Sequence, residues 1–400
     1  MHDNMAGFGS KRCLTAVMRV ALVMMTGATA IGSARADGFT LNAKLGGFFE
    51  MDTNPLLDRK GEKTLYGWNS VPELILTGRT PDLTLDTDTF VSDGRFNLQE
   101  FNSTDVHNYT TLNYQGDDYY LKLEGGFAFD TTRTSEIESS GNNVAGVRHY
   151  GINFQPEFGY SINEVEQVVV TANYLANFYD NTSEFTDYES YGISPKFLYA
   201  FTLRDTGFIA LQASHFDTLS GRDSEGDSVG PYIGWIHHFS NRFTTTADVG
   251  YHIIHNNSDS DGSSWDNDYF YDFALTYGVE GEDPDVVTLS VARKLVPQSS
   301  AQQVTQTAIS LKETHHFTPR FSGVVDFTYH NQDYSLSKDG HLKDYIEGSA
   351  ALQYNVTREL VVGSSYRYRQ ESQFGEGGTA KGHTVMLTVT YSPFTPLTSW

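Results

Sequence analysis

Apolar and polar residues alternate along most of this chain in short segments, which is the period that a β-strand imposes on a surface with two different faces. In residues 384–391, Val385, Leu387 and Val389 share one face, and threonines occupy the other. The same alternation, with charged side chains confined to one face, recurs at 119–130, 243–252 and 360–369. One apolar face suits lipid and one polar face suits water, so the pattern predicts a transmembrane β-barrel.

The connections between these segments alternate in length. Short connections such as Gly116-Asp117 and Ser240-Asn241 follow the even-numbered strands, and long acidic or Ser/Gly-rich connections such as 131–144 and 256–266 follow the odd-numbered ones. Short periplasmic turns and long outer loops are typical of outer-membrane barrels. We predict strands at 39–51, 64–78, 82–94, 106–115, 118–130, 145–160, 164–178, 187–203, 207–216, 228–239, 242–255, 267–279, 285–295, 303–316, 319–330, 344–356, 358–370 and 382–394.

The predicted fold is therefore an all-β, antiparallel up-and-down barrel of about 18 strands, with about 16 strands as the alternative. A sheet in hydrocarbon cannot leave an edge unpaired, so residues 37–400 should form one closed domain. An even strand count places both termini in the periplasm. A barrel of this size has a lumen wide enough for water unless its loops fold inward.

The first 36 residues have the organisation of a secretory signal peptide. Basic residues precede the apolar stretch 20–31, and Ala34-Arg35-Ala36 follows it, which predicts cleavage before Asp37. The apolar stretch is too short for a membrane helix, and no later segment offers about 18 uninterrupted apolar residues. The only cysteine, Cys13, lies in this leader, so the mature chain should carry neither a disulfide nor a lipid anchor.

Charge and aromatic content narrow the class of protein. The formal net charge is −23, and removing the leader, which carries four Lys or Arg and one Asp, makes it more negative. Nucleic acid is therefore not an expected partner. An apolar fraction of 39% suits a wet interior, and 24 Tyr with 26 Phe suit aromatic girdles at two membrane interfaces. A soluble β-solenoid or propeller is the alternative, although neither explains the alternating loop lengths.

Alternation also predicts which side chains line the lumen. These residues carry both signs of charge, so we expect weak ion selectivity, tilted toward cations by the acidic loops. Inward Thr, Ser and Tyr side chains would either hydrogen-bond and stack on sugars or form a hydrated wall. The predicted pore-lining residues are Lys122, Glu124, Asp248, Asp272, Lys312, Asp326, Glu347, Arg367 and Arg369.

Prolines recur within four of the predicted descending strands, at Pro72, Pro156, Pro195 and Pro231. Proline removes a donor from the hydrogen-bond ladder, so each could mark a β-bulge that re-aims lumen residues. The alternative, which we favour, is a shared tilt or register device of barrel closure.

One outer loop has the oxygen-rich spacing of an EF-hand calcium loop. Its candidate calcium ligands are Asn257, Asp259, Asp261 and Asp268, with Gly262 at the turn. Strands rather than helices flank this loop, so a solvated acidic loop is the alternative. No other cofactor is expected.

Histidines recur near strand ends, as at His237-His238 and His315-His316, where interfacial histidines explain them better than a metal site. No G-x-S-x-G element occurs, and no spacing singles out a Ser/His/Asp triad. We therefore predict that the protein is not an enzyme.

The segment Phe48-Phe49-Glu50-Met51-Asp52-Thr53-Asn54-Pro55 and the Val71-Pro72 strand resemble a family of outer-membrane β-barrel proteins associated with bacterial exopolysaccharide export systems. The resemblance implies a bacterial outer-membrane location more than an activity. Trp400 is aromatic, as signals for the barrel-assembly machinery are, but Pro393 and Pro396 interrupt the last alternation. We expect the working signal to end at Phe394, followed by a short periplasmic tail.

We therefore expect a passive, porin-like channel that sits in outer-membrane lipid and passes polar solutes or polysaccharide. The alternatives are a structural or adhesive barrel with an occluded lumen, and a barrel hydrolase. The sequence does not define the oligomeric state, because barrel walls that face each other resemble walls that face lipid.

Overall fold

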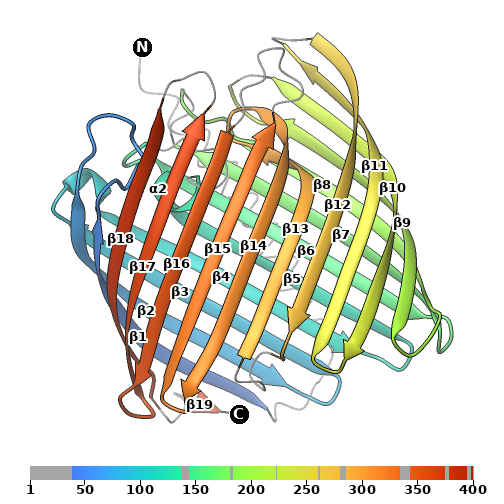
Figure 1. Ribbon diagram of the computed structural model, residues 1–400, viewed down its shortest axis with the longest axis horizontal. Helices are drawn as coiled ribbons and strands as arrows, with labels where there is room; N and C mark the ends of the chain where they lie inside the picture. Colours follow the sequence, from blue (N-terminus) through green and yellow to red (C-terminus); the bar gives the residue numbers. More distant parts are fainter. Residues whose placement is uncertain are drawn as a thin grey trace.

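The computed structural model of the protein describes residues 38–136, 144–180, 183–221, 223–259, 262–279, 285–333, 343–373, 378–393 and 398–399, so the predicted leader lies outside it. Eighteen long antiparallel strands each pair with their sequence neighbours and close into a barrel, which confirms the predicted fold and strand number (Figure 1). Among the described residues, no helix has the length and apolar content needed to cross a membrane.

The strand bounds lie close to the predicted ranges. Two short helices, η1 (Gln99–Phe101) and α2 (Thr132–Ser135), lie in connections between strands. The long strands are β1 (Phe39–Asp52), β2 (Leu65–Arg79), β3 (Leu83–Phe96), β4 (Ser103–Gln115), β5 (Tyr119–Thr131), β6 (Arg148–Ser161), β7 (Glu166–Tyr179), β8 (Tyr188–Ala200), β9 (Asp205–Thr218), β10 (Ser224–Ser240), β11 (Phe243–Ser258), β12 (Gly262–Tyr277), β13 (Asp285–Gln298), β14 (Gln302–Thr318), β15 (Phe321–Asp333), β16 (Lys343–Asn355), β17 (Leu360–Gln373) and β18 (Thr379–Tyr391).

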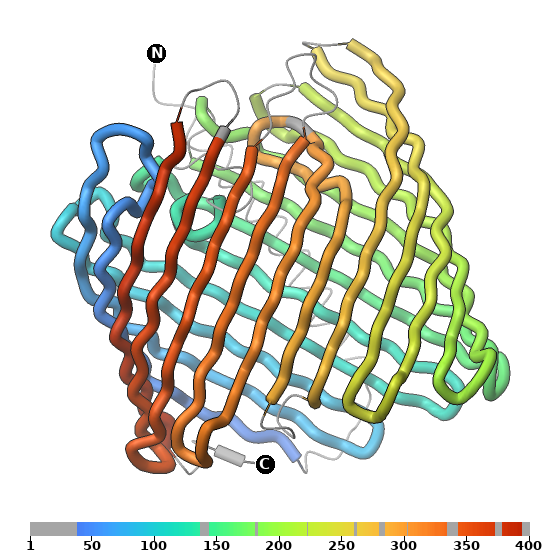
Figure 2. Tube along the Cα trace, in the orientation of Figure 1, coloured from blue at the N-terminus to red at the C-terminus, as the bar shows by residue number. Residues whose placement is uncertain are grey.

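The barrel closes where its first and last long strands meet. β1 pairs with β18 from Leu45 opposite Tyr391 to Asp52 opposite Thr384, and Figure 2 shows these strands, blue and red, side by side. A two-residue strand, β19 (Thr398–Ser399), pairs with the start of β1. Two residues of the predicted tail after Phe394 therefore belong to the sheet.

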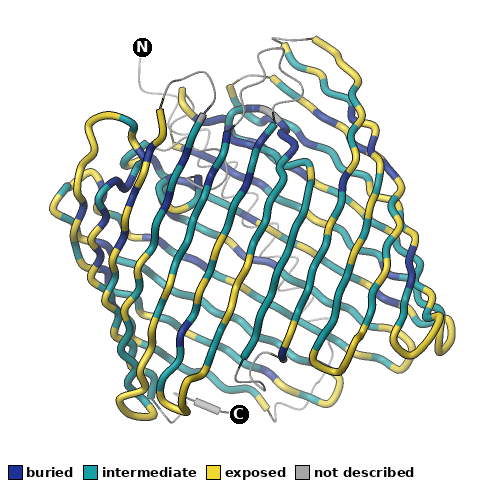
Figure 3. Tube along the Cα trace, viewed as in Figure 1, coloured by how far each residue is buried: buried dark blue, intermediate teal, exposed yellow. Residues whose placement is uncertain are grey.

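The exposure of side chains separates the two faces of the wall (Figure 3). On β18, the side chains of Val385, Leu387 and Val389 are 46%, 56% and 44% exposed, whereas Thr384 is fully buried. The exposed apolar register forms the outer belt. The other register faces the lumen, where Arg133 of α2 reaches Glu50 of β1 across 83 residues of chain.

The four strand prolines do not create bulges. On β10, for example, Val229 pairs with Ile253 and Tyr232 with Gly250, so the register is unchanged across Pro231. The ladder to the following strand lacks pairs beside each proline, because proline has no N–H to donate. The bulge hypothesis is wrong, since no extra residue enters any of these strands.

Three connections fold into the end of the barrel opposite the short turns. Glu136, which follows α2, accepts hydrogen bonds from the hydroxyls of Tyr179 at 2.5 Å and Ser299 at 2.8 Å. The N–H of Thr186 donates to the carbonyl oxygen of Ser299 at 2.8 Å. These contacts define a mouth cluster of the 132–136, 183–187 and 298–302 segments. A buried apolar core supports it, formed by Val147, Tyr179, Phe185, Tyr188 and Phe216.

The ladder between β12 and β13 stops early. It runs from Tyr277 opposite Val287 to Tyr271 opposite Arg293. Beyond that point β12 continues along β11 to Gly262, while β13 continues along β14. Figure 1 shows β12, in yellow, diverging from β13 toward the upper rim.

The β13–β14 hairpin bends into the barrel above this split. A Cβ built on the inward-facing Gly226 of β10 would lie 2.5 Å from Oε1 of Gln303 on β14. Strands β10 and β14 are not neighbours in the wall, so the hairpin must lie against the inner face of β10. The lumen is therefore narrowed by wall strands as well as by loops.

Candidate functional site: the barrel lumen

The structure places all nine predicted pore-lining residues on the inner face of the wall. Cross-strand pairing shows this directly, since Arg367 lies opposite the buried Thr384 and Glu347 lies opposite Arg369. The remaining residues in the inward register are Lys122, Glu124, Asp248, Asp272, Lys312 and Asp326. Their part in conduction stays a prediction.

The structure brings three of the nine together in a hollow of about 440 Å³, which we name the arginine hollow. Arg367, Arg369 and Glu347 enter it from β16 and β17, and Arg133 enters it from α2. The carboxylates of Glu50 and Asp105 also line it. Positive and negative groups thus face one water-accessible space, an arrangement that orients polar solutes more than it selects ions by sign.

A buried network holds one side of this hollow. The carboxylate of Asp52 accepts hydrogen bonds from the Arg369 guanidinium, from the Thr384 hydroxyl at 3.0 Å and from the N–H of Asn54 at 3.0 Å. The side chains of Asp52 and Arg369 are 1% and 4% exposed. Because β1, β17 and β18 each contribute a residue, the network ties together the strands at the closure.

The roof of the arginine hollow depends on one ion pair. Arg133 of α2 donates to both carboxylate oxygens of Glu50, at 3.1 and 3.4 Å, and its guanidinium lies 5.2 Å from the ring centroid of Phe96. Within the described part of the chain, Arg367 forms no ion pair.

Stacked rings line the same hollow, and the sequence interpretation missed them. The ring centroids of Phe90 and His107 lie 4.8 Å apart and are stacked, and Tyr109 follows at 6.5 Å from His107. Tyr109 is 54% exposed although it points inward, opposite Gly126, so it borders open lumen. The signal in the sequence was an aromatic residue in the polar register of β4, next to Asp105 and His107.

A second lumenal space of about 350 Å³, the aspartate hollow, lies on the β7–β14 side of the lumen. Asp248 and Asp272, which are directly paired across β11 and β12, line it with His252, Phe270 and Arg293. The nearby Lys196 ammonium lies 4.5 Å from the ring centroid of Phe208. The predicted residues Lys122, Glu124, Lys312 and Asp326 line neither hollow; Lys122 and Glu124 pair with each other at 2.6 Å.

The structure does not gather the candidate calcium ligands. Asn257 pairs with Ser263, whereas Asp268 pairs with His252, five residues along β11. At about 3.3 Å per residue this separates the two by roughly 16 Å, too far for one ion. Asp261 lies outside the described residues, and no group of three His, Cys, Asp or Glu among the described residues could hold a metal.

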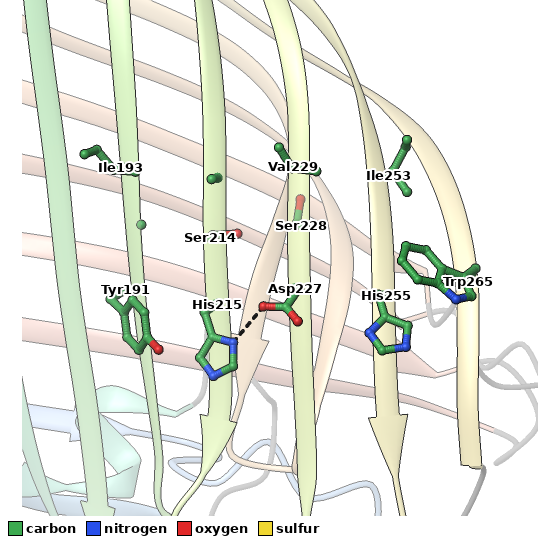
Figure 4. A pocket seen from close by; sticks show the side chains of 12 residues that line it. Tyr191, Ile193, Ser214, His215, Asp227, Ser228, Val229, Ile253, His255 and Trp265 are labelled. Atoms are coloured by element: carbon green, nitrogen blue, oxygen red, sulfur yellow. Dashed lines mark hydrogen bonds and ion pairs between the residues drawn. The ribbon is translucent and has the colours of Figure 1, made fainter.

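A groove of about 450 Å³ lies on the outer face of β8–β12, near the split end of the wall. Figure 4 shows Ile193, Val229 and Ile253 in one row, and an aromatic and polar row beside it that ends at Trp265. In the second row His215 contacts Asp227 at 2.8 Å. His237 and His315 likewise contact Asp205 and Asp285. These histidines therefore pair with aspartates near strand ends.

A closed antiparallel barrel with an apolar outer belt and a charged lumen defines the class of this protein: it is a membrane-spanning β-barrel. Residues 288–392 match a family model described as "Putative beta-barrel porin 2". No curated protein sequence matches the chain.

Solved outer-membrane barrels resemble it at the level of the fold. The outer membrane channel DcaP of Acinetobacter baumannii is 13% identical, with 90% of this chain and 99% of that chain covered and a TM-score of 0.42. OccAB4 of Acinetobacter baumannii is 12% identical, with 90% and 99% covered and a TM-score of 0.47. The ferric citrate transporter FecA is 12% identical with a TM-score of 0.46; 90% of this chain is covered, and the chain spans 65% of that protein's length.

Proposed function

We propose that the protein is a passive channel that carries polar solutes across the bacterial outer membrane through its lumen. The observation that supports this most is the inner face, where ionised and hydroxyl side chains border two hollows and the inward Tyr109 is 54% exposed. A wall of this kind holds water rather than a packed apolar core. Its matched family model, that of a β-barrel porin, points the same way.

The short turns would face the periplasm, together with the two chain termini, and the mouth cluster would face the outside. The mature chain would begin at Asp37, after the leader is removed, and reach the membrane through the barrel-assembly machinery. Neither catalysis nor a cofactor is part of this proposal.

The cargo we propose is a sugar-like polar solute or a polysaccharide. Stacked Phe90, His107 and Tyr109 offer ring faces, and Arg367 and Glu347 offer charged hydrogen-bonding groups in the same hollow. Sugars present both apolar C–H faces and hydroxyls, so this combination suits them. The resemblance to barrels of exopolysaccharide export systems supports the longer polymer as cargo.

We expect weak cation selectivity. The arginine hollow balances three arginines against three carboxylates, and the aspartate hollow has Asp248 and Asp272 with Arg293 and Lys294, so the tilt toward cations would come from the acidic outer loops. One unit charge at ~8 Å from an ion in water contributes about 0.5 kcal/mol, a factor of about two in the local ion ratio. Removing a single lumen charge should therefore shift the selectivity modestly.

A structural barrel with a closed lumen is the second candidate, and the mouth cluster favours it. Glu136, Ser299 and Thr186 join three inward segments by direct hydrogen bonds over a buried apolar core. If that cluster seals the mouth, no ion will pass.

Single-channel recording of the refolded protein in a planar bilayer distinguishes the two. Stepwise openings and a small cation-directed reversal potential under a salt gradient are expected. Tyr109→Ala should weaken the block of current by maltooligosaccharides while leaving the openings intact, and Arg95→Gln, on the outer face, is the matched control. A silent bilayer with correctly folded protein would reject the channel and favour the structural barrel.

A further inference from the structure

The split between β12 and β13 interrupts the backbone ladder of the wall beside the aspartate hollow. We propose that it is a lateral portal for an amphipathic molecule, with a hydrocarbon or aromatic tail and an uncharged or cationic polar head, which moves between the outer leaflet and that hollow. The proposal goes beyond the axial channel, because it concerns a second route and a different class of solute.

A side-chain latch, not a backbone ladder, closes the split. Arg293 of β13 donates through Nη2 to Oδ2 of Asp268 on β12 at 2.7 Å and through Nη1 to the Thr307 hydroxyl of β14 at 3.2 Å. Its guanidinium lies 5.5 Å from the ring centroid of Tyr269, and Thr305 donates to the same Asp268 oxygen at 3.3 Å. Side-chain contacts of this kind can break and re-form without unpairing a strand.

The register shows that the hairpin lies behind the wall here. Arg293 and Thr307 belong to the register that faces lipid lower on β13 and β14, whereas Asp268 belongs to the inward register of β12. The outer face of the hairpin therefore meets the inner face of β12. A molecule that entered between these two faces would pass from the outside of the barrel into its lumen.

The edge of β12 that faces β13 has backbone donors that are already satisfied above the split. The N–H groups of Asn267 and Tyr269 donate to the carboxylates of the preceding residues, Asp266 and Asp268, at 2.7 and 2.8 Å. In the described part of the chain, no strand pairs with this edge at residues 262–270. Donors already satisfied by side chains offer little to an incoming strand, so the edge favours a portal over strand docking.

The surfaces on either side of the split suit the two ends of an amphipathic molecule. Outside, the groove presents Ile193, Val229 and Ile253 and ends at Trp265, which lies on the free part of β12 and is 72% exposed. Inside, the aspartate hollow is lined by apolar and charged residues together. They include Phe270, Leu295 and Pro297, with Asp248, Asp272 and Lys294. Because Arg293 is held by Asp268, the adjacent carboxylates of Asp248 and Asp272 outnumber the other lining cation, Lys294, and disfavour an anionic head group.

Photolabelling in vesicles tests the portal. The full barrel is reconstituted in phosphatidylcholine vesicles that contain a dodecyltrimethylammonium analogue with a diazirine in its tail, and labelled peptides are mapped by mass spectrometry. The apolar belt, for example Leu387, should be labelled in every sample. The proposal also expects label on Phe270 or Leu295, with none on Phe90 in the arginine hollow.

Three variants separate the latch from general effects. Arg293→Gln should increase labelling of Phe270 or Leu295 severalfold, and Thr307→Val, which leaves the charge pair in place, should increase it less. Arg95→Gln removes an exposed pair with Asp93 at 2.6 Å and should leave labelling unchanged. Heat-modifiable gel mobility checks that each variant is folded. If Arg293→Gln does not fold, Thr307→Val alone tests the latch.

Label confined to the outer belt in every folded variant would overturn the portal. Equal label on Phe90 and Phe270 would overturn it too, because entry would then be through the mouth. Neither result depends on ion conduction, so the portal and the axial channel can fail separately.

Discussion

Neutralising Asp52 should weaken the barrel far more than neutralising an exposed carboxylate. In Asp52→Asn the Arg369 guanidinium, 4% exposed, loses its charge partner, while the contacts to Thr384 and Asn54 are partly retained. Removing one member of a buried pair costs about 3–5 kcal/mol, because the other charge stays buried and uncompensated. Since an amide can still accept hydrogen bonds, we expect the lower part of this range.

The assay is urea unfolding of the barrel refolded in lipid vesicles, followed by tryptophan fluorescence and by gel mobility. Asp86→Asn is the matched control, because Asp86 also pairs with an arginine, Arg79 at 2.8 Å, but both side chains are about half exposed. An exposed pair contributes below about 1 kcal/mol. If Asp52→Asn and Asp86→Asn shifted the unfolding free energy equally, the argument from burial at the closure would be refuted.

Three further changes can be measured in simple assays. Gly126→Ala should destabilise the folded barrel by about 1–3 kcal/mol in urea unfolding, because the added Cβ would lie 2.2 Å from the carbonyl oxygen of Asn108. Gly348→Ala is the control: nothing lies within 4 Å of its added Cβ, so the unfolding free energy should stay the same or rise. Ala301→Gly should stabilise the barrel by no more than about 1 kcal/mol in the same assay, because Ala301 has a left-handed backbone with φ 64°, which glycine adopts without strain. A loss of stability would show that the backbone at residue 301 is not strained. Arg133→Gln should give larger or noisier single-channel steps by releasing α2 from β1, and unchanged traces would contradict its role in the roof of the hollow.

The strands could be predicted because lipid and water impose a contrast on every second residue. The alternation around Leu387 or Phe127 therefore gave β18 and β5 to within a few residues. It also gave the inward register of Arg367 and Asp248. The alternation of apolar and polar residues shows only which side of the wall a side chain occupies. In a closed up-and-down barrel, this information determines most of the fold.

The same signal could not give contacts inside the barrel. Glu136 and Ser299 are 163 residues apart in sequence, and their hydrogen bond depends on how three connections fill the mouth. The bend of β13 and β14 is visible in the sequence as polar residues at positions that should face lipid. These residues are Arg293, Thr305 and Thr307. The EF-hand-like spacing misled because a regular hairpin extends β11 and β12 through the expected loop and carries Asp268 away from Asn257.

The strand prolines have a consequence for how the barrel deforms. Pro195 of β8 pairs with Val170 of β7, and Leu211 of β9 pairs with Pro231 of β10. Because the β8–β9 register places Leu211 opposite Pro195, the two prolines lie in one row of the sheet. Each removes a cross-link from that row, so this side of the cylinder has a line of low stiffness. Under lateral pressure from the bilayer, the cross-section should flatten along this line, and amide hydrogen exchange should be fastest there among the wall strands.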